Sequence, residues 1–194
     1  MNRCLSLLAT GVIVLACAAG AAADNDVMCI CVDDDAAATC GGNVEAEVFG
    51  QLSLYLCVLE PSESQIKAWE AYLDINGDEN LLLSTTLLGD YSINVGQGER
   101  EYVVGAALDP LRPNSANLVP LLAMNATILG EDPIFFYIRP VPGSISFPDL
   151  PGYAPEVDVE RPCTPCGGEN APDLRINAPI EESSWGEVKE LYGN

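Results

Sequence analysis

The chain has 194 residues, of which 29 are acidic, 8 are basic and none is histidine, so its formal net charge is −21. This charge repels nucleic acid phosphates and anionic lipid headgroups, and it excludes a nucleic-acid-binding protein. Without histidine the chain lacks the usual general base and the commonest zinc ligand, so only paired carboxylates, a lysine base or thiols remain for catalysis. The length suits one domain with a sizeable core and a tail.

Residues 1–23 have the pattern of a secretory signal. Arg3 gives a positive start, residues 5–16 form an almost wholly apolar run, and a small-residue stretch ends at Ala23. We predict cleavage after Ala23 and a protein that is secreted or held in the cell envelope. The alternative starts from Cys17, because residues 14–17 resemble a bacterial lipobox, in which the signal is cut before the cysteine and the thiol is acylated. We favour the first route, since Val14 fits a lipobox less well than leucine does.

Residues 27–141 contain short apolar segments separated by turn residues, a spacing typical of an antiparallel β-sandwich. The expected strands are residues 27–32, 44–49, 51–59, 66–75, 81–88, 91–95, 101–108, 118–129 and 134–139. No apolar run after the signal approaches the ~20 residues that cross a bilayer as a helix. We therefore predict an all-β fold, an antiparallel sandwich of eight or nine strands over residues 24–154, with no membrane span.

Residues 62–74 fit two kinds of element. Ser62 and Gln65 form a capping box, and Ile66, Trp69 and Leu73 have helical spacing. The same segment also alternates apolar and polar residues, as a strand does. We favour a strand.

The composition changes after residue 141, because nine of the fourteen prolines fall between residues 140 and 179. Proline removes a backbone donor and fixes φ, so we predict that residues 155–183 form an extended strap or linker outside the sheets. Ser184 and Glu187 form a second capping box, and the apolar residues after it share one face. A short C-terminal helix is therefore expected over residues 184–194.

Six cysteines follow the signal: Cys29, Cys31, Cys40, Cys57, Cys163 and Cys166. On a strand Cys29 and Cys31 point to one face and lie roughly 6.5 to 7 Å apart, at or beyond the limit for a mutual disulfide. Six cysteines allow fifteen connectivities. The simplest joins Cys29 and Cys31 to Cys163 and Cys166, which straps the tail to the first strand, and joins Cys40 to Cys57. A four-cysteine zinc site and a redox-active Cys-x-x-Cys are the alternatives, and we favour disulfides for an exported protein.

The segment Asp74, Asn76, Asp78 and Asn80 alternates oxygen-bearing side chains, as the start of a calcium loop does. Glu79 stands where that loop needs glycine, and Thr85 stands where it needs glutamate. The alternative is a hairpin turn on Asn76-Gly77, and we favour the turn. We therefore expect no cofactor, and calcium is the alternative that this segment leaves open.

Aromatic residues on the expected strands, Trp69 and Tyr72 above all, are candidates for a sugar-binding platform, although such residues more often pack inside a sandwich. Carboxylate pairs such as Glu45 with Glu47 are candidates for glycoside hydrolysis, but no aromatic cleft accompanies them.

Residues 66–74, 82–89 and 118–129 resemble the strands of cohesin-like and carbohydrate-binding sandwich modules. The closing residues 184–192 resemble a C-terminal tail of exported proteins from environmental bacteria. Neither resemblance implies catalytic residues. Together they imply a surface or secreted binding module, whose tail is either a docking or sorting tag or a helix that packs on the domain.

We therefore predict an exported, disulfide-strapped β-sandwich that acts as a non-enzymatic binding or structural module. Its partner would be a protein or a polysaccharide at the cell surface. The alternatives are an extracellular hydrolase that uses two carboxylates and a calcium-dependent adhesion module.

Overall fold

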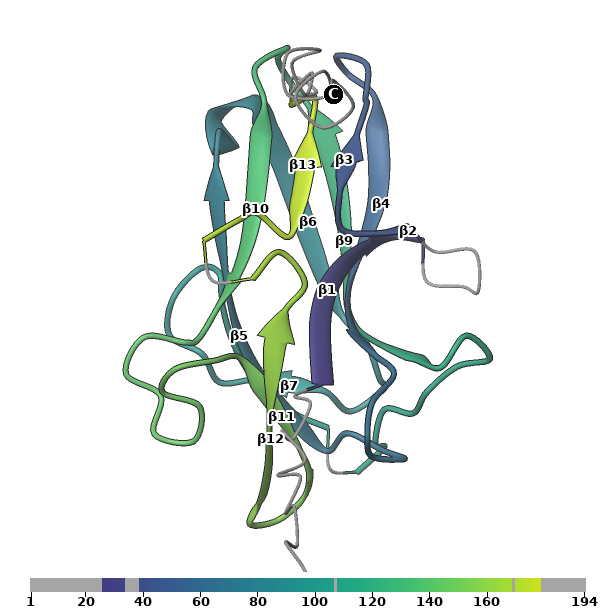
Figure 1. The fold of residues 1–194 in the computed structure, drawn as a ribbon, viewed down its shortest axis with the longest axis vertical. Coiled ribbons are helices and arrows are strands. Elements are labelled where there is room, and N and C mark those ends of the chain that lie inside the picture. The colour runs from purple at the N-terminus through teal and green to yellow at the C-terminus, as the bar shows by residue number, and fades with distance from the viewer. Residues whose placement is uncertain (1–25, 34–38, 107, 169, 179–194) are drawn as a thin grey trace, which may run out of the picture.

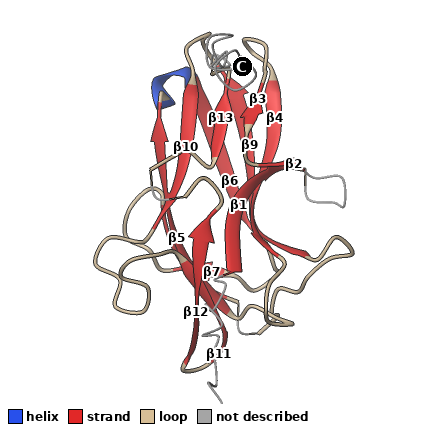
Figure 2. Ribbon diagram, viewed as in Figure 1, coloured by secondary structure: helices blue, strands red, loops and turns tan. Residues whose placement is uncertain are grey.

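A computed structural model describes residues 26–33, 39–106, 108–168 and 170–178, and nearly all regular structure in these residues is β-strand (Figures 1 and 2). The prediction of an all-β sandwich is confirmed. The strands are β1 (Asp26–Val32), β2 (Thr39–Cys40), β3 (Asn43–Val44), β4 (Gln51–Leu59), β5 (Ala68–Asn76), β6 (Leu81–Leu87), β7 (Ile93–Asn94), β8 (Glu101–Gly105), β9 (Leu118–Ile128), β10 (Ile134–Arg139), β11 (Gly152–Glu156), β12 (Val159–Pro165) and β13 (Leu174–Ile176).

The strands form two facing sheets that share one strand. Sheet A has the order β12-β1-β4-β9-β6, with β2 beside β1. Sheet B contains β3-β13-β10-β5, with β8 and β11 on either side of β5 and β7 beyond β8. β12 pairs antiparallel with β11 and parallel with β1, so it connects the two sheets along one side of the sandwich.

The core lies between the sheets because inward-facing apolar residues alternate with outward-facing ones. On β5 the side chains of Trp69, Ala71, Leu73 and Ile75 are buried, whereas the residues between them are half-buried. This period of two settles residues 62–74 in favour of a strand from Ala68 onward, as we predicted. The capping box at Ser62 starts no helix.

Several expected strands are shorter than predicted, and two of them keep at most two of their residues. Of residues 44–49 only Val44 lies in β3, because the chain turns at Phe49, whose φ is 66°. Of residues 91–95 only Ile93 and Asn94 form a strand.

The proline-rich segment differs from the prediction that it lies outside the sheets. Residues 155–178 contain the last two residues of β11 and all of β12 and β13, so the sandwich does not end near Ala154. β12 tolerates its prolines because the neighbouring residues supply the donors: the Cys163 N–H donates to the Pro151 carbonyl at 2.8 Å, and the Cys166 N–H to the Met28 carbonyl at 2.9 Å. A proline therefore costs only the bond at its own position.

The expected hairpin on Asn76-Gly77 is wrong. Gly77 has φ 83° and leads into a 3₁₀ turn, Asp78–Asn80, which carries the chain from β5 in sheet B to β6 in sheet A. A side chain at Gly77 would bring a Cβ to 2.6 Å from the Pro133 carbonyl oxygen. The glycine therefore permits a crossing between sheets rather than a pairing of neighbouring strands.

The signal at residues 1–23 and the helix at residues 184–194 lie outside the described residues and stay predictions. Within the described ranges, no helix is long and apolar enough to cross a membrane.

Candidate functional site

The outer face of sheet B carries a hollow beside charged side chains. Glu70 and Tyr72 point outward from β5, and their partners across the β5–β8 ladder are Val103 and Glu101. Two carboxylates thus lie diagonally on neighbouring strands, with Val103 and Tyr72 completing the square.

Two connections rise beside this square and close a groove of about 640 Å³, which we call the sheet B groove. One is the β7–β8 connection and the other is the β10–β11 connection (Figure 1). The groove is lined by Glu70, Val95, Gly96, Gln97, Gly98, Glu101, Val103, Val141, Pro142, Gly143, Ser144 and Ile145.

The β10–β11 connection is fixed to the sheet by hydrogen bonds. The Ser144 hydroxyl donates to the Glu70 carboxylate at 2.6 Å and accepts from the Phe147 N–H at 3.0 Å. Phe147 is buried and packs so closely on Gly152 that a Cβ there would lie 2.3 Å from its ring. This wall of the groove is therefore held in place before any ligand arrives.

The β7–β8 connection is fixed in the same way. The Glu101 carboxylate accepts from the Gly98 N–H at 2.8 Å, and the Asn94 side-chain oxygen accepts from the N–H groups of Gly96 and Val103 at 3.0 and 2.9 Å. Glu101 therefore shapes the loop as well as contributing charge.

The walls of the groove expose apolar side chains to solvent. Ile145 is 96% exposed and Val95 is 67% exposed, and both line the groove. A second hollow of about 410 Å³ shares Glu70 and Val103 with it and extends past Val157, which is 84% exposed. Exposed apolar groups beside a preformed groove are typical of binding surfaces.

The charge along both hollows is mainly negative. Lys67 is the one cation among the residues that line them, and its ammonium contacts Glu156 at 2.6 Å. That contact lowers the pKa of Glu156. Glu70, Glu101, Asp158 and Glu160 supply the remaining charge.

Of the two residues named for the predicted sugar platform, Trp69 cannot serve and Tyr72 stays untested. Trp69 is fully buried and stacks on Tyr102, with ring centroids 5.7 Å apart, and burial raises the pKa of Tyr102. Tyr72 is three residues further along β5 and therefore lies on the outer face. Tyr137 is also on that face, but the Arg139 guanidinium lies 4.9 Å from its ring centroid and covers one side of the ring.

Two of the four residues of the expected calcium loop, Asp74 and Asp78, form ion pairs with arginines. Arg139 lies 3.7 Å from the Asp74 carboxylate, and Arg100 lies 3.0 Å from the Asp78 carboxylate. Asn76 ends β5, whereas Asn80 closes the 3₁₀ turn and has a buried side-chain nitrogen that lacks a hydrogen-bond partner. Within the described residues no group of three or more acidic or cysteine side chains is arranged to hold a metal ion. Calcium binding stays an untested prediction.

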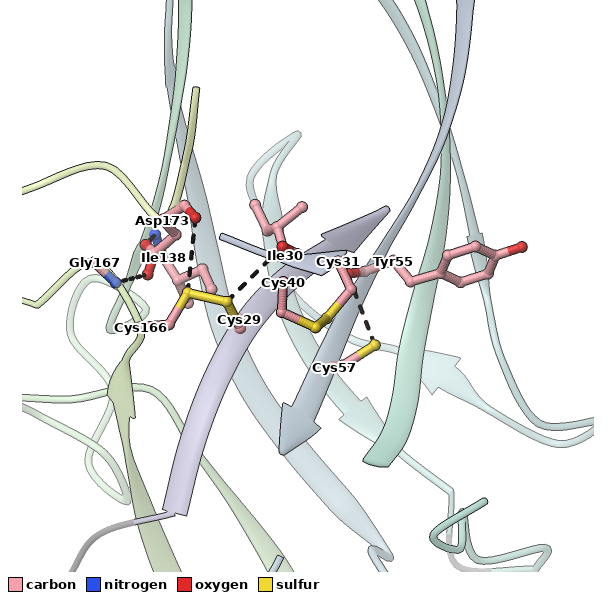
Figure 3. Close-up of a disulfide and its surroundings, with 10 residues drawn as sticks. All are labelled: Cys29, Ile30, Cys31, Cys40, Tyr55, Cys57, Ile138, Cys166, Gly167 and Asp173. Atoms are coloured by element: carbon pink, nitrogen blue, oxygen red, sulfur yellow. Dashed lines mark hydrogen bonds between the residues drawn. A yellow bond between two sulfur atoms is a disulfide. The ribbon is translucent and has the colours of Figure 1, made fainter. Parts of the chain in front are cut away.

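Two disulfides stabilise the start of sheet A (Figure 3). Cys29 pairs with Cys166, as one half of the expected strap. Cys31 pairs with Cys40, which corrects the expected bonds of Cys31 to the tail and of Cys40 to Cys57. The reason is strand register: β2 folds back on β1 and places Cys40 directly opposite Cys31, with 3.9 Å between their Cα atoms.

Cys57 and Cys163 belong to neither bridge and lie on opposite faces of sheet A. Cys57 packs with Cys29 and Cys31 on the outer side, whereas Cys163 is buried among the core residues between the sheets. Burial raises the pKa of the Cys163 thiol, as does the nearby Asp26 carboxylate to a smaller extent. This thiol therefore lacks the electropositive setting of a reactive cysteine.

The loop behind the first disulfide is held by a buried carboxylate. Asp173 is 1% exposed and accepts from the Ile138 N–H at 2.6 Å and the Gly167 N–H at 2.8 Å (Figure 3). Burial raises its pKa. Asp173 thus joins the proline-rich segment to β10, a structural role that its sequence position did not suggest.

The candidate glycosidase pair Glu45 and Glu47 borders a shallow hollow with Ala46, Asn177 and Ala178. The Asn177 side chain donates to the Ala46 carbonyl and accepts from its N–H, so the contacts there hold β3 beside β13. No aromatic residue lines this hollow among the described residues.

Sequence reasoning missed the residues that build the groove walls. Ser144, Ile145 and Asn94 carry no motif, and only the fold brings residue 144 beside residue 70. The one signal in the sequence was Ile145, an apolar residue in a segment rich in proline, glycine and serine.

No protein-family model and no curated protein matches the chain. It is similar to two solved structures. One is a cohesin module from the family 33 glycoside hydrolase of Clostridium perfringens, with 14% identity, a TM-score of 0.49, and coverage of 79% of this chain and 98% of that one. The other is the third ScaB cohesin of R. flavefaciens, solved in complex with a group 1 dockerin, with 13% identity, a TM-score of 0.45, and coverage of 71% and 92%.

Proposed function

We propose that this chain is an exported, non-enzymatic binding module, and that the sheet B groove binds a segment of a partner protein. The observation that carries the proposal is a groove whose walls are fixed by Ser144 and Glu101 and whose rim exposes Ile145 and Val95. A fixed surface loses little conformational freedom on binding, so less of the interaction energy is lost to ordering the protein.

The groove chemistry favours a partner with an apolar side chain next to a basic one. Ile145 and Val95 offer the apolar contact, and Glu70 lies between the two hollows. A lysine or arginine of the partner would meet mainly carboxylates along this face, which raises the association rate and excludes acidic partners.

A polysaccharide is the less favoured ligand for the same face. Sugar rings stack on exposed aromatic faces, but Trp69 is buried and Arg139 covers one side of the Tyr137 ring. A hydrolase that uses two carboxylates stays the alternative function. Glu70 and Glu101 have contacts that serve the loops, which supports a binding role instead.

Export is part of the proposal. Two disulfides support a protein that matures in an oxidising compartment. The signal at residues 1–23 would deliver it there, with a lipid anchor at Cys17 as the alternative route.

Selection from a random peptide library on the purified protein tests the proposal. The groove variant carries Val95→Ser with Ile145→Ser, and the matched control carries Leu108→Ser, which removes an apolar side chain that is 83% exposed away from the groove. We expect peptides that combine an apolar residue with lysine or arginine to bind the native protein and the control at least tenfold more tightly than the groove variant. Equal binding to all three proteins would refute the groove as the site, and turnover of a polysaccharide or ester at an ordinary enzymatic rate would refute the non-enzymatic role.

A further inference from the structure

The free edge of sheet A is a second surface with unusual properties. β6 pairs with β9 along seven consecutive residues without a bulge, and among the described residues no strand pairs with its other side. The strands β2, β3 and β7, which also lie at edges, have only two residues each. β6 is therefore the one long edge in the described part of the chain.

The β6 edge lacks the usual protection against strand pairing. Its residues are Leu81, Leu82, Leu83, Ser84, Thr85, Thr86 and Leu87, without charge, proline or glycine. Natural sheets commonly protect such an edge with a lysine, a proline or a bulge, because unpaired backbone groups recruit another strand. In a chain of net charge −21, seven uncharged residues at an open edge stand out.

The hydrogen-bond pattern identifies which backbone groups are open. The Leu129 N–H donates to the Asn80 carbonyl at 2.7 Å, and the Leu88 N–H donates to the Leu121 carbonyl at 3.2 Å, so the even-numbered residues of this strand face β9. Strand geometry alternates, so Leu83 and Thr85 direct their N–H and carbonyl groups to the free side.

The side chains of β6 that face the core prevent the strand from rotating about its long axis. Leu81, Leu83 and Leu87 pack against the core. The open backbone groups are therefore held in a fixed row, and a strand that adds to them needs no rearrangement of this protein.

Charges at both ends of β6 determine what can pair there. Exposed Glu79 precedes the strand and exposed Asp90 follows it. In an antiparallel pairing of two copies centred on Ser84, Asp78 of one copy would lie opposite Asp90 of the other, and each copy carries 21 excess negative charges. A second copy is repelled, whereas a segment with basic residues at its ends is attracted.

We propose that the β6 edge is a docking site for an extended segment of a partner protein, uncharged in its middle and basic at its ends, which adds to sheet A as a further strand. Backbone hydrogen bonds to Leu83 and Thr85 give the affinity, and the acidic residues at the ends of the strand select the partner. This site is separate from the sheet B groove.

Binding of a labelled synthetic peptide to the full exported protein tests the proposal. The probe alternates threonine and valine and has two lysines at each end. One control peptide carries glutamates in place of the lysines, and another is N-methylated on the amides that would face β6. We expect the lysine peptide to bind at least tenfold more tightly than either control, and to weaken as salt is added. Equal binding of the N-methylated peptide, or no binding at millimolar concentration, would overturn the proposal.

Two variants locate the site on the protein. Thr85→Pro removes an N–H from the open side and no bond to β9, and it should weaken the lysine peptide at least tenfold. Glu79→Gln with Asp90→Asn should weaken it several-fold and reduce the salt dependence. Unchanged affinity in both variants would overturn the proposal, and so would self-association of the native protein that Thr85→Pro abolishes, because the occupant would then be a second copy.

Hydrogen exchange in the native protein keeps the proposal testable if Thr85→Pro fails to fold. Bound peptide should slow exchange at the amides of Leu83 and Thr85, whereas the Ser84 amide, already bonded to β9, serves as the internal control. Exchange at Leu83 and Thr85 that does not change at saturating peptide would overturn the proposal.

Discussion

The two disulfides should contribute very different free energies of unfolding, because they close loops of very different length. Cys29 and Cys166 are 137 residues apart, whereas Cys31 and Cys40 are 9 apart. In the chain-entropy model, restricting the unfolded chain is worth about 5 kcal/mol for the long loop and about 2.6 kcal/mol for the short one. We therefore expect removal of the long-range bridge to cost about 2 kcal/mol more than removal of the short one.

The measurement compares two double variants, Cys29→Ala with Cys166→Ala and Cys31→Ala with Cys40→Ala, by urea unfolding without reductant. Packing losses act against the expected order: Cys29 and Cys31 are equally buried, but Cys40 is half-buried and Cys166 is exposed, so the short-bridge variant loses more contact. An equal or larger loss for the short-bridge variant would refute the loop-length reasoning.

Three further predictions follow from single side chains. Trp69→Ala should lower the free energy of unfolding by about 3 to 5 kcal/mol, because it empties the centre of the core. Tyr72→Ala on the outer face should cost far less. Similar losses of unfolding free energy for the two variants in urea titrations would place Trp69 at the surface. Burial raises the pKa of Asp173, so this carboxylate binds a proton more tightly in the folded state than in the unfolded state. The stability of the native protein relative to an Asp173→Asn variant should therefore increase as the pH falls from neutral through the raised pKa. A pH-independent difference between the two unfolding curves would contradict the burial of that carboxylate. Arg139 and Arg100 already contact Asp74 and Asp78, so a chelator should leave the melting temperature unchanged; a fall that Asp74→Ala with Asp78→Ala abolishes would establish a calcium site instead.

The sequence was sufficient to predict elements whose residues alternate over their whole length. β4 and β10 match the expected residues 51–59 and 134–139, and β5 differs by only a few, because apolar periodicity and turn residues are both local. β12 could not be predicted this way, since its prolines violate local propensity and its partner β1 lies at the other end of the chain. In β12, pairing with a strand distant in sequence outweighs the local preference against a strand.

The site was less predictable than the fold for a related reason. The cysteine pairing followed from β2, a two-residue strand that has no sequence signal of its own. The groove depends on a serine of one connection meeting a glutamate of a distant strand, and neither residue belongs to a recognisable motif. We named Trp69 as a sugar-binding candidate because it is aromatic, but its ring stacks on Tyr102.

The position of β12 between the two sheets constrains the order in which the molecule can mature. A ribosome releases β1 first, but the strand that flanks it in parallel, and the thiol that Cys29 requires, arrive more than 130 residues later. Cys31 and Cys40 are only 9 residues apart in the chain, so we expect them to be oxidised first in the oxidising compartment, while Cys29 is still reduced. Cys57 lies directly opposite Cys29 on β4, so we expect a premature Cys29–Cys57 crosslink to be the error that thiol isomerisation corrects.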